Sequence, residues 1–168
     1  MVPDIDLQLQ AAIKALADTV MPAVDPGNKM AAEQLGLAIA TLGIVRQHLP
    51  LARRLARRAL GHAIGMATEL SSVGGEKAAA LARPLAAAEA ALADPEADTA
   101  DIDRARGALN EAICAFVDGE SEGPAARAVE AVVIRRSRET TELARAWCLP
   151  AGFEPYPERL PLIESLLR

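Results

Sequence analysis

The residues best suited to ligand chemistry lie on the polar face of a helix predicted over residues 50–72. Its sequence, "PLARRLARRALGHAIGMATEL", places alanine, leucine and methionine on one side at helical spacing. The other side carries Arg53, Arg54, Arg57, Arg58, Gly61, His62, Gly65 and Glu69. Guanidinium groups match the oxygens of phosphate and carboxylate, and glycines leave bare backbone for a ligand or helix to approach. One interpretation is an anion-binding groove, with Arg54, Arg57, Arg58, His62 and Glu69 as candidate ligand-binding residues.

Two other interpretations of this arginine face stay open. The first is a solvated basic face, on which neighbouring arginines repel one another by roughly a few tenths of a kcal/mol per pair. The second is a protein contact. Residues 46–83 carry seven basic and two acidic side chains, whereas residues 89–122 carry two basic and ten acidic ones. If these two segments pair, within the chain or between two copies, the excess charge of each is neutralised by the other.

A second candidate is Arg136, which falls inside the apolar stripe of a helix predicted to run from Pro124 to about residue 147. An unpaired buried guanidinium is costly, so the head of Arg136 either reaches water, pairs with a buried carboxylate or binds a ligand anion. Glu33 is the first candidate for a carboxylate partner. We include Arg136 among the candidate ligand-binding residues.

Catalytic, metal and cofactor motifs are weak throughout. His62 and Glu69 form the only visible acid–base pair, and Glu69 lies seven residues beyond His62. The two histidines lack ExxH or HxxxH spacing, and "SSVGGEK" lacks the spacing of a phosphate-binding loop. Cys114 and Cys148 form no CxxC pair and are expected to be reduced thiols. We therefore expect no metal and no cofactor.

The elements that must position these residues are predicted to be helices. Hydrophobic residues make up 51% of the chain and aromatics only 2%, and alanine, the best helix former, supplies about a fifth. Helical periodicity predicts helices over residues 4–22, 26–48, 50–72, 76–93, 100–118 and 124–147, and a short one over 160–167. Pro84 predicts a kink or break near residue 80. The expected fold is an all-α, up-and-down bundle of five or six helices over residues 1–147, followed by a proline-rich C-terminal extension over 148–168 that packs on the bundle or on a partner subunit.

The helix over 26–48 is apolar on nearly every side. Asp25 is expected to cap it with Pro26 at its first position, and the residues after Gln34 are expected to lie in the core. Gly36, Ala40 and Gly43 share one face and permit close approach of another helix. This helix is therefore predicted near the centre of the bundle.

Charge and targeting signals restrict the partners. The net charge of −5 and the pI of about 5.1 disfavour nucleic acid. The first ten residues lack a basic leader, so a cytoplasmic location is expected. The uncharged stretch from Leu35 to Val45 is too short to span a membrane.

The leading hypothesis for function is a non-enzymatic helical module that acts by association, as a homodimer. The apolar helix and the apolar C-terminal segment offer more hydrophobic surface than one small bundle covers. The alternative is a protein that binds a small anion on the arginine face. An enzyme that uses His62 and Glu69 is the third hypothesis.

Overall fold

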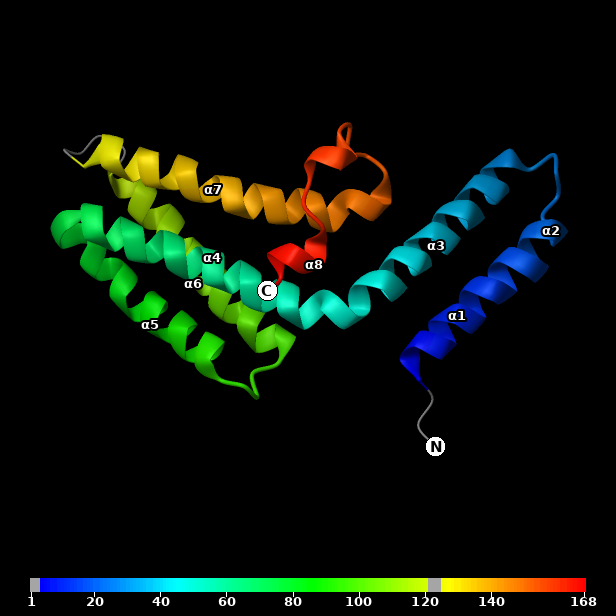
Figure 1. The fold of residues 1–168 in the computed structure, drawn as a ribbon, viewed down its shortest axis with the longest axis horizontal. Helices are drawn as coiled ribbons and strands as arrows, with labels where there is room; N and C mark the ends of the chain where they lie inside the picture. The colour runs from blue at the N-terminus through cyan, green and yellow to red at the C-terminus, as the bar shows by residue number, and fades with distance from the viewer. Residues whose placement is uncertain (1–3, 121–124) are drawn as a thin grey trace. The chain divides into compact units, whose positions relative to one another are not determined.

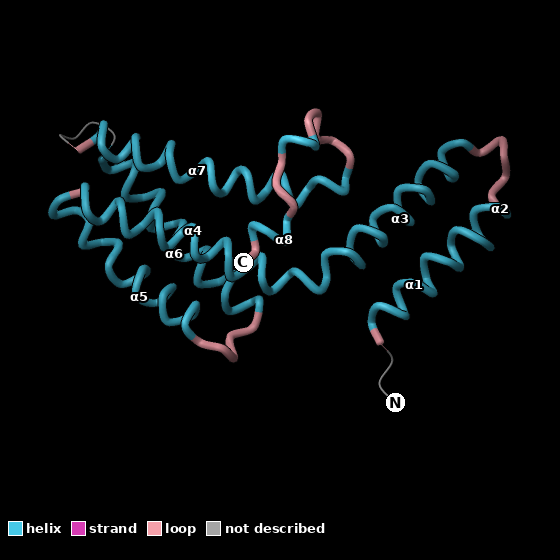
Figure 2. The backbone as a smooth tube through the Cα atoms, viewed as in Figure 1, coloured by secondary structure: helices cyan, strands magenta, loops and turns pink. Residues whose placement is uncertain are grey.

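The structure is a computed structural model that describes residues 4–120 and 125–168, and all the regular elements in these ranges are helical (Figure 1). The predicted all-α bundle with a short C-terminal helix is confirmed. The contacts divide the chain into two compact units, Met1–Ala52 and Arg53–Arg168, whereas the sequence suggested one bundle over residues 1–147. The tube in Figure 2 shows helices along most of the described residues, joined by loops, with no strand among them.

The first unit is a helical hairpin. Its first arm consists of α1 (Ile5–Ala15), a π-helical turn (Leu16–Val20) and α2 (Met21–Ala23), and its second arm is α3 (Lys29–His48). Asn28, rather than Asp25, is the N-cap of α3, because its side-chain oxygen accepts a hydrogen bond from the amide of Ala31 at 3.1 Å. Asp25 instead accepts from the amide of Gly27 at 2.8 Å and closes the turn between the arms.

The two arms meet along a half-buried apolar seam. It comprises Leu9, Ile13 and Leu16 on the first arm and Leu35, Ile39 and Leu42 on α3. Asp6 and Arg46 join the arms by two hydrogen bonds, at 2.6 and 2.9 Å.

The prediction that α3 lies in the core is wrong, because none of its residues is buried. A two-helix hairpin gives each helix one neighbour, and a helix that is apolar on every side needs several. The continuous helical stretch Lys29–Val73 contains one window, none of it buried, that meets the length and composition of a membrane span.

The second unit holds the hydrophobic core. Its main helices are α4 (Ala52–Val73), α5 (Ala79–Ala93), α6 (Thr99–Glu120) and α7 (Ala126–Cys148). A 3-10 turn (Gly75–Ala78) precedes α5. The backbone therefore changes from 3-10 to α-helical geometry after Ala78, and α5 then continues through Pro84. The largest fully buried side chains are Leu60, Leu70, Leu81, Ile102 and Leu109. Because alanine lines much of α5, this helix packs closely on α6.

The C-terminal extension folds back onto the second unit. Two 3-10 turns (Leu149–Ala151 and Pro157–Arg159) lead to α8 (Ile163–Leu166). Gly152 follows the first turn with φ of 78°, a conformation that favours glycine. Arg145 on α7 donates hydrogen bonds to both carboxylate oxygens of Glu154, at 3.0 and 2.7 Å, and Leu167 is buried. The extension is thus anchored by an ion pair and by an apolar residue.

Candidate functional site

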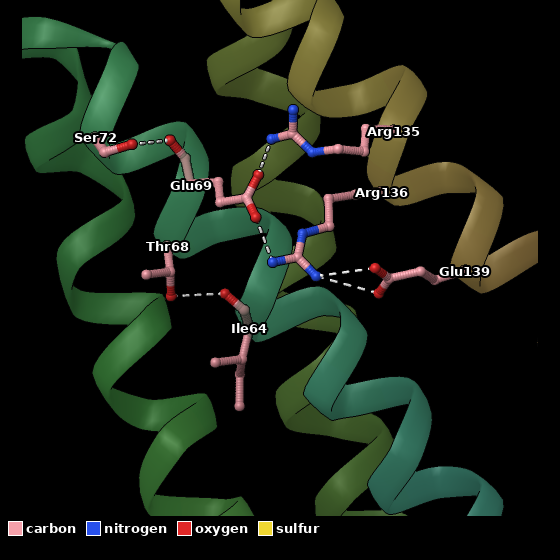
Figure 3. A network of polar contacts seen from close by, with 7 residues as sticks. All are labelled: Ile64, Thr68, Glu69, Ser72, Arg135, Arg136 and Glu139. Atoms are coloured by element: carbon pink, nitrogen blue, oxygen red, sulfur yellow. Dashed lines mark hydrogen bonds and ion pairs between the residues drawn. The ribbon is translucent and has the colours of Figure 1, made fainter. Parts of the chain in front are cut away.

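The most concentrated charge cluster joins α4 to α7. Glu69 projects from α4, and one of its carboxylate oxygens accepts from Arg135 while the other accepts from Arg136 (Figure 3). Arg136 also donates to Glu139, one turn further along α7, at 3.2 Å. Of the three outcomes open for Arg136, the structure shows an ion pair. Its partners are Glu69 and Glu139, so the expectation of Glu33 is wrong.

A glycine makes room for the Arg136 guanidinium. A Cβ atom added at Gly65 would lie 3.3 Å from both Cζ and Nη1 of Arg136. The guanidinium therefore rests directly on the backbone of α4. By contrast, a Cβ atom at Gly61 would meet nothing within 4 Å. Gly65 thus permits a close contact with the Arg136 side chain, whereas Gly61 has open space around it.

The charges of this cluster stabilise one another. Hydrogen bonds from Arg135 and Arg136 lower the pKa of the Glu69 carboxyl, and the bond to Glu69 raises the pKa of Arg136. The side chains of Arg136 and Glu69 are 25% and 29% exposed, so solvent partly screens their pair. A carboxylate held ionised by two guanidinium groups is a poor general base. The arrangement is that of a structural ion-pair network that holds α4 and α7 together.

The arginine face of α4 splits into separate contacts. Arg57 donates to the carbonyl oxygens of Leu92 and Asp94, at 2.5 and 3.4 Å, where α5 ends. Arg53 donates to the carbonyl oxygens of Pro95 and Ala97. Cations at a helix C-terminus satisfy its unpaired carbonyls and interact favourably with the helix dipole.

The remaining arginines of this face border a hollow. Arg54 donates to the carbonyl oxygen of Leu167 at 3.0 Å. Arg54, Arg57 and Arg58 line an open hollow of about 300 Å³ together with Gly61, Leu92, Leu167 and Arg168. Several donors of these side chains are therefore engaged by backbone carbonyls of the chain itself.

His62 belongs to a different hollow. It lines a cavity of about 260 Å³ between α4, α6 and α7, and neither Glu69 nor Arg136 lines that cavity. Burial, followed by the charge of Arg58, lowers the pKa of His62, so the imidazole is neutral at pH 7. The structure thus brings Arg54, Arg57 and Arg58 together and pairs Glu69 with Arg136. His62 lines a separate cavity, although the charges of Glu139 and Arg136 also act on its pKa.

Sequence reasoning missed Arg106, which also lines this cavity. On α6 it stands four residues after Ile102 and three before Leu109, both fully buried. A charged residue at a core-facing position of an amphipathic helix was the available signal, and it is the same signal that singled out Arg136.

No group of three or more histidine, cysteine, aspartate or glutamate side chains in the described ranges 4–120 and 125–168 has metal-binding geometry. Cys114 and Cys148 are both exposed free thiols.

Comparison of the chain with protein-family models, with curated proteins and with solved structures finds no match in any of the three.

Proposed function

We propose that the chain acts by association and forms a homodimer through the exposed side of α3. The observation that carries this proposal is a hairpin of strongly apolar sequence in which no described residue is buried. Large apolar side chains left in water are unfavourable, by about 25 cal/mol for each Å² that a partner could cover. Such a surface favours a binding partner.

Exposed uncharged side chains line one side of α3. We define the outer stripe as Met30, Leu37, Thr41 and Val45, which follow one another at intervals of seven, four and four residues. These spacings keep them on one side of the helix, away from the Leu35–Ile39–Leu42 seam. The exposed fractions of Met30 and Leu37 are 66% and 60%. These four side chains carry no charge, as expected of the central part of a protein interface, and the charged Glu33 lies beside them, one turn before Leu37.

A second copy fits this stripe better than a bilayer does. The uncharged stretch 35–45 is eleven residues long and therefore spans about 16 Å, whereas the hydrocarbon core of a membrane is about 30 Å thick. Glu33 and Arg46 bound the stretch on either side and would lie within the lipid if the helix spanned it. A second copy brings an identical stripe and leaves Glu33 and Arg46 beside the contact, where water can still reach them, rather than in lipid.

The available area is sufficient for a dimer. The arm of residues 5–23 and the 20-residue α3 are each about 30 Å long, and helices pack about 10 Å apart. The outer side of α3 alone therefore covers about 30 by 10 Å, or about 600 Å² over two copies, whereas a face that also includes the first arm covers about 30 by 20 Å, or about 1,200 Å². The larger area reaches the lower limit of stable, specific interfaces, so we expect the dimer contact to extend from the outer stripe onto the first arm. Two hairpins packed face to face form a four-helix bundle, in which α3 gains the neighbours that it lacks.

The test is the mass of the full chain in solution. Light scattering after gel filtration at micromolar concentration should give about 35 kDa, twice the chain mass of 17.6 kDa. Leu37→Glu places a charge at the middle of the outer stripe and should give the monomer mass with unchanged helix content. The matched control is Leu7→Glu, because Leu7 is 62% exposed on α1, outside the stripe. A monomeric wild type, or equal dissociation by both variants, would overturn the proposal.

A further inference from the structure

The cavity between α4, α6 and α7 has a mostly polar lining and opens to solvent on the side of Asn110, Thr140 and Thr141, which are exposed. Its polar residues are His62 from α4, Arg106 and Asn110 from α6, and Ser137, Thr140 and Thr141 from α7. Ala59, Ala63 and Met66 add an apolar wall from α4. Ligand sites in bundles are built in this way, from inward-facing side chains of neighbouring helices.

The polar residues interrupt the core-facing surface of two helices. On α7 the buried residues Val132 and Leu143 are separated by residues 133–142, three helical turns in which no side chain is buried. On α6, Arg106 occupies the core-facing position between Ile102 and Leu109. Apolar residues at these positions would pack better, and local departures from core patterning are expected at functional sites.

Two atoms of the lining residues lack hydrogen-bond partners. Nδ1 of His62 and Nε of Arg106 are shielded from solvent, and neither has a partner within the part of the chain that the structure describes. Arg106 uses another nitrogen to pair with Asp103 at 2.9 Å, so its Nε remains available. Buried polar groups are nearly always satisfied, and a cavity of this polarity is where a bound molecule would do so.

The lining indicates the charge and size of that molecule. Among the described residues that line it, Arg106 is the only charged one and none is a carboxylate, so an anion is favoured over a cation. A single guanidinium already paired with Asp103 suits a monoanion better than a phosphate dianion. The volume of 260 Å³ corresponds to about nine water molecules. The alanine and methionine wall accepts a short hydrocarbon group.

We infer that this cavity binds a small monocarboxylate, with the carboxylate at Arg106 and the hydroxyls of α7 and the aliphatic part against Ala59, Ala63 and Met66. The ligand class is thus a short-chain aliphatic acid. The site is separate from the outer stripe of the first unit, so it does not depend on the proposed dimer.

Butyrate is the probe for the test, and butyramide is its uncharged control. Both are titrated into the ¹⁵N-labelled full-length protein up to tens of millimolar, and amide chemical shifts are followed. Saturable shifts at residues around the cavity are expected with butyrate, with at least tenfold weaker binding of butyramide. No saturable shift with butyrate, equal binding of butyramide, or shifts confined to other parts of the protein would each overturn the inference.

Two arginine variants distinguish a direct contact between Arg106 and the ligand from a general effect of the protein's positive charge on anion binding. Arg106→Met should weaken butyrate binding at least tenfold. Arg104→Met is the matched control, because Arg104 lies on the same helix in a similar pair with Asp101 but does not line the cavity. Its affinity should stay within twofold of wild type, and an equal loss in both variants would overturn the inference. If Arg106→Met fails to fold, Thr140→Val takes its place with the same expected direction, and unchanged affinity in that variant would overturn the inference.

Discussion

Gly74, immediately after α4, packs against the aromatic ring of Phe116 on α6. A Cβ atom added at Gly74 would lie 2.7 Å from Cε2 of Phe116 and still closer to Cζ, and 3.1 Å from the carbonyl oxygen of Leu70. Phe116 is only 5% exposed, so its ring cannot swing into solvent. Gly74→Ala should therefore force the end of α4 away from α6.

The magnitude follows from two opposing terms. Overpacking a well-filled core costs about 1–3 kcal/mol, whereas replacing a glycine by alanine stabilises by about 0.4–1 kcal/mol through the unfolded chain. We therefore expect Gly74→Ala to lower the free energy of unfolding by about 1–2 kcal/mol. Gly107→Ala is the control. Gly107 lies inside α6 with open space around it, so this change should raise stability by about 0.5–1 kcal/mol.

Urea unfolding followed by the fluorescence of Trp147, the sole tryptophan, measures the second unit directly. The double variant Gly74→Ala/Phe116→Leu removes the distal ring atoms and should be less destabilised than the sum of its single variants. Additive effects, or a Gly74→Ala protein as stable as wild type, would refute the steric reasoning.

The other predictions concern the charged groups of the second unit. Arg136→Met should lower the free energy of unfolding by about 1–2 kcal/mol, between the values for exposed and fully buried pairs, and urea midpoints measure it. Because the pKa of Glu69 is lowered in the folded protein, its stabilising contribution is full above the ordinary glutamate pKa of about 4.3 and is lost as the pH falls through the lowered value. Acid titration of Glu69→Gln should accordingly show a weaker loss of stability below pH 4. Lys77→Met should cost about 1–3 kcal/mol, because it leaves the buried carboxylate of Glu120, 2.9 Å from the Lys77 ammonium, without this partner. Arg57→Met should cost about 1 kcal/mol and increase amide exchange at the end of α5, since two carbonyls there lose a donor.

Local sequence patterns predicted the helices of the second unit well. Ile102, Leu109, Ile113 and Phe116 recur at helical spacing, and all four are buried. Such a stripe shows that one face of a helix lies in a core. The pattern can be recognised from residues three or four positions apart, without knowledge of the rest of the chain.

Pairings between distant segments could not be predicted in the same way. Glu69 and Arg136 are 67 residues apart, and nothing in the spacing around either residue identifies the other. The exposure of α3 is a similar case. A helix that is apolar on every side is expected to be buried by other protein surfaces. Its own sequence does not indicate whether those surfaces belong to the same chain or to a second copy.

The stretch 133–142 of α7, in which no side chain is buried, has a consequence for motion. The helix is held at one end by Val129 and Val132 and at the other by Leu143 and Ala146, with the ion pairs to Glu69 near the first anchor. Local opening of a protein begins where few apolar contacts hold the backbone. We expect amide hydrogen exchange in the middle of α7 to be faster than in α5 and α6, whose packed alanines and leucines hold their backbones together. The wall of the cavity that moves most readily is then the one that carries Ser137, Thr140 and Thr141, so a ligand can enter while the rest of the bundle stays folded.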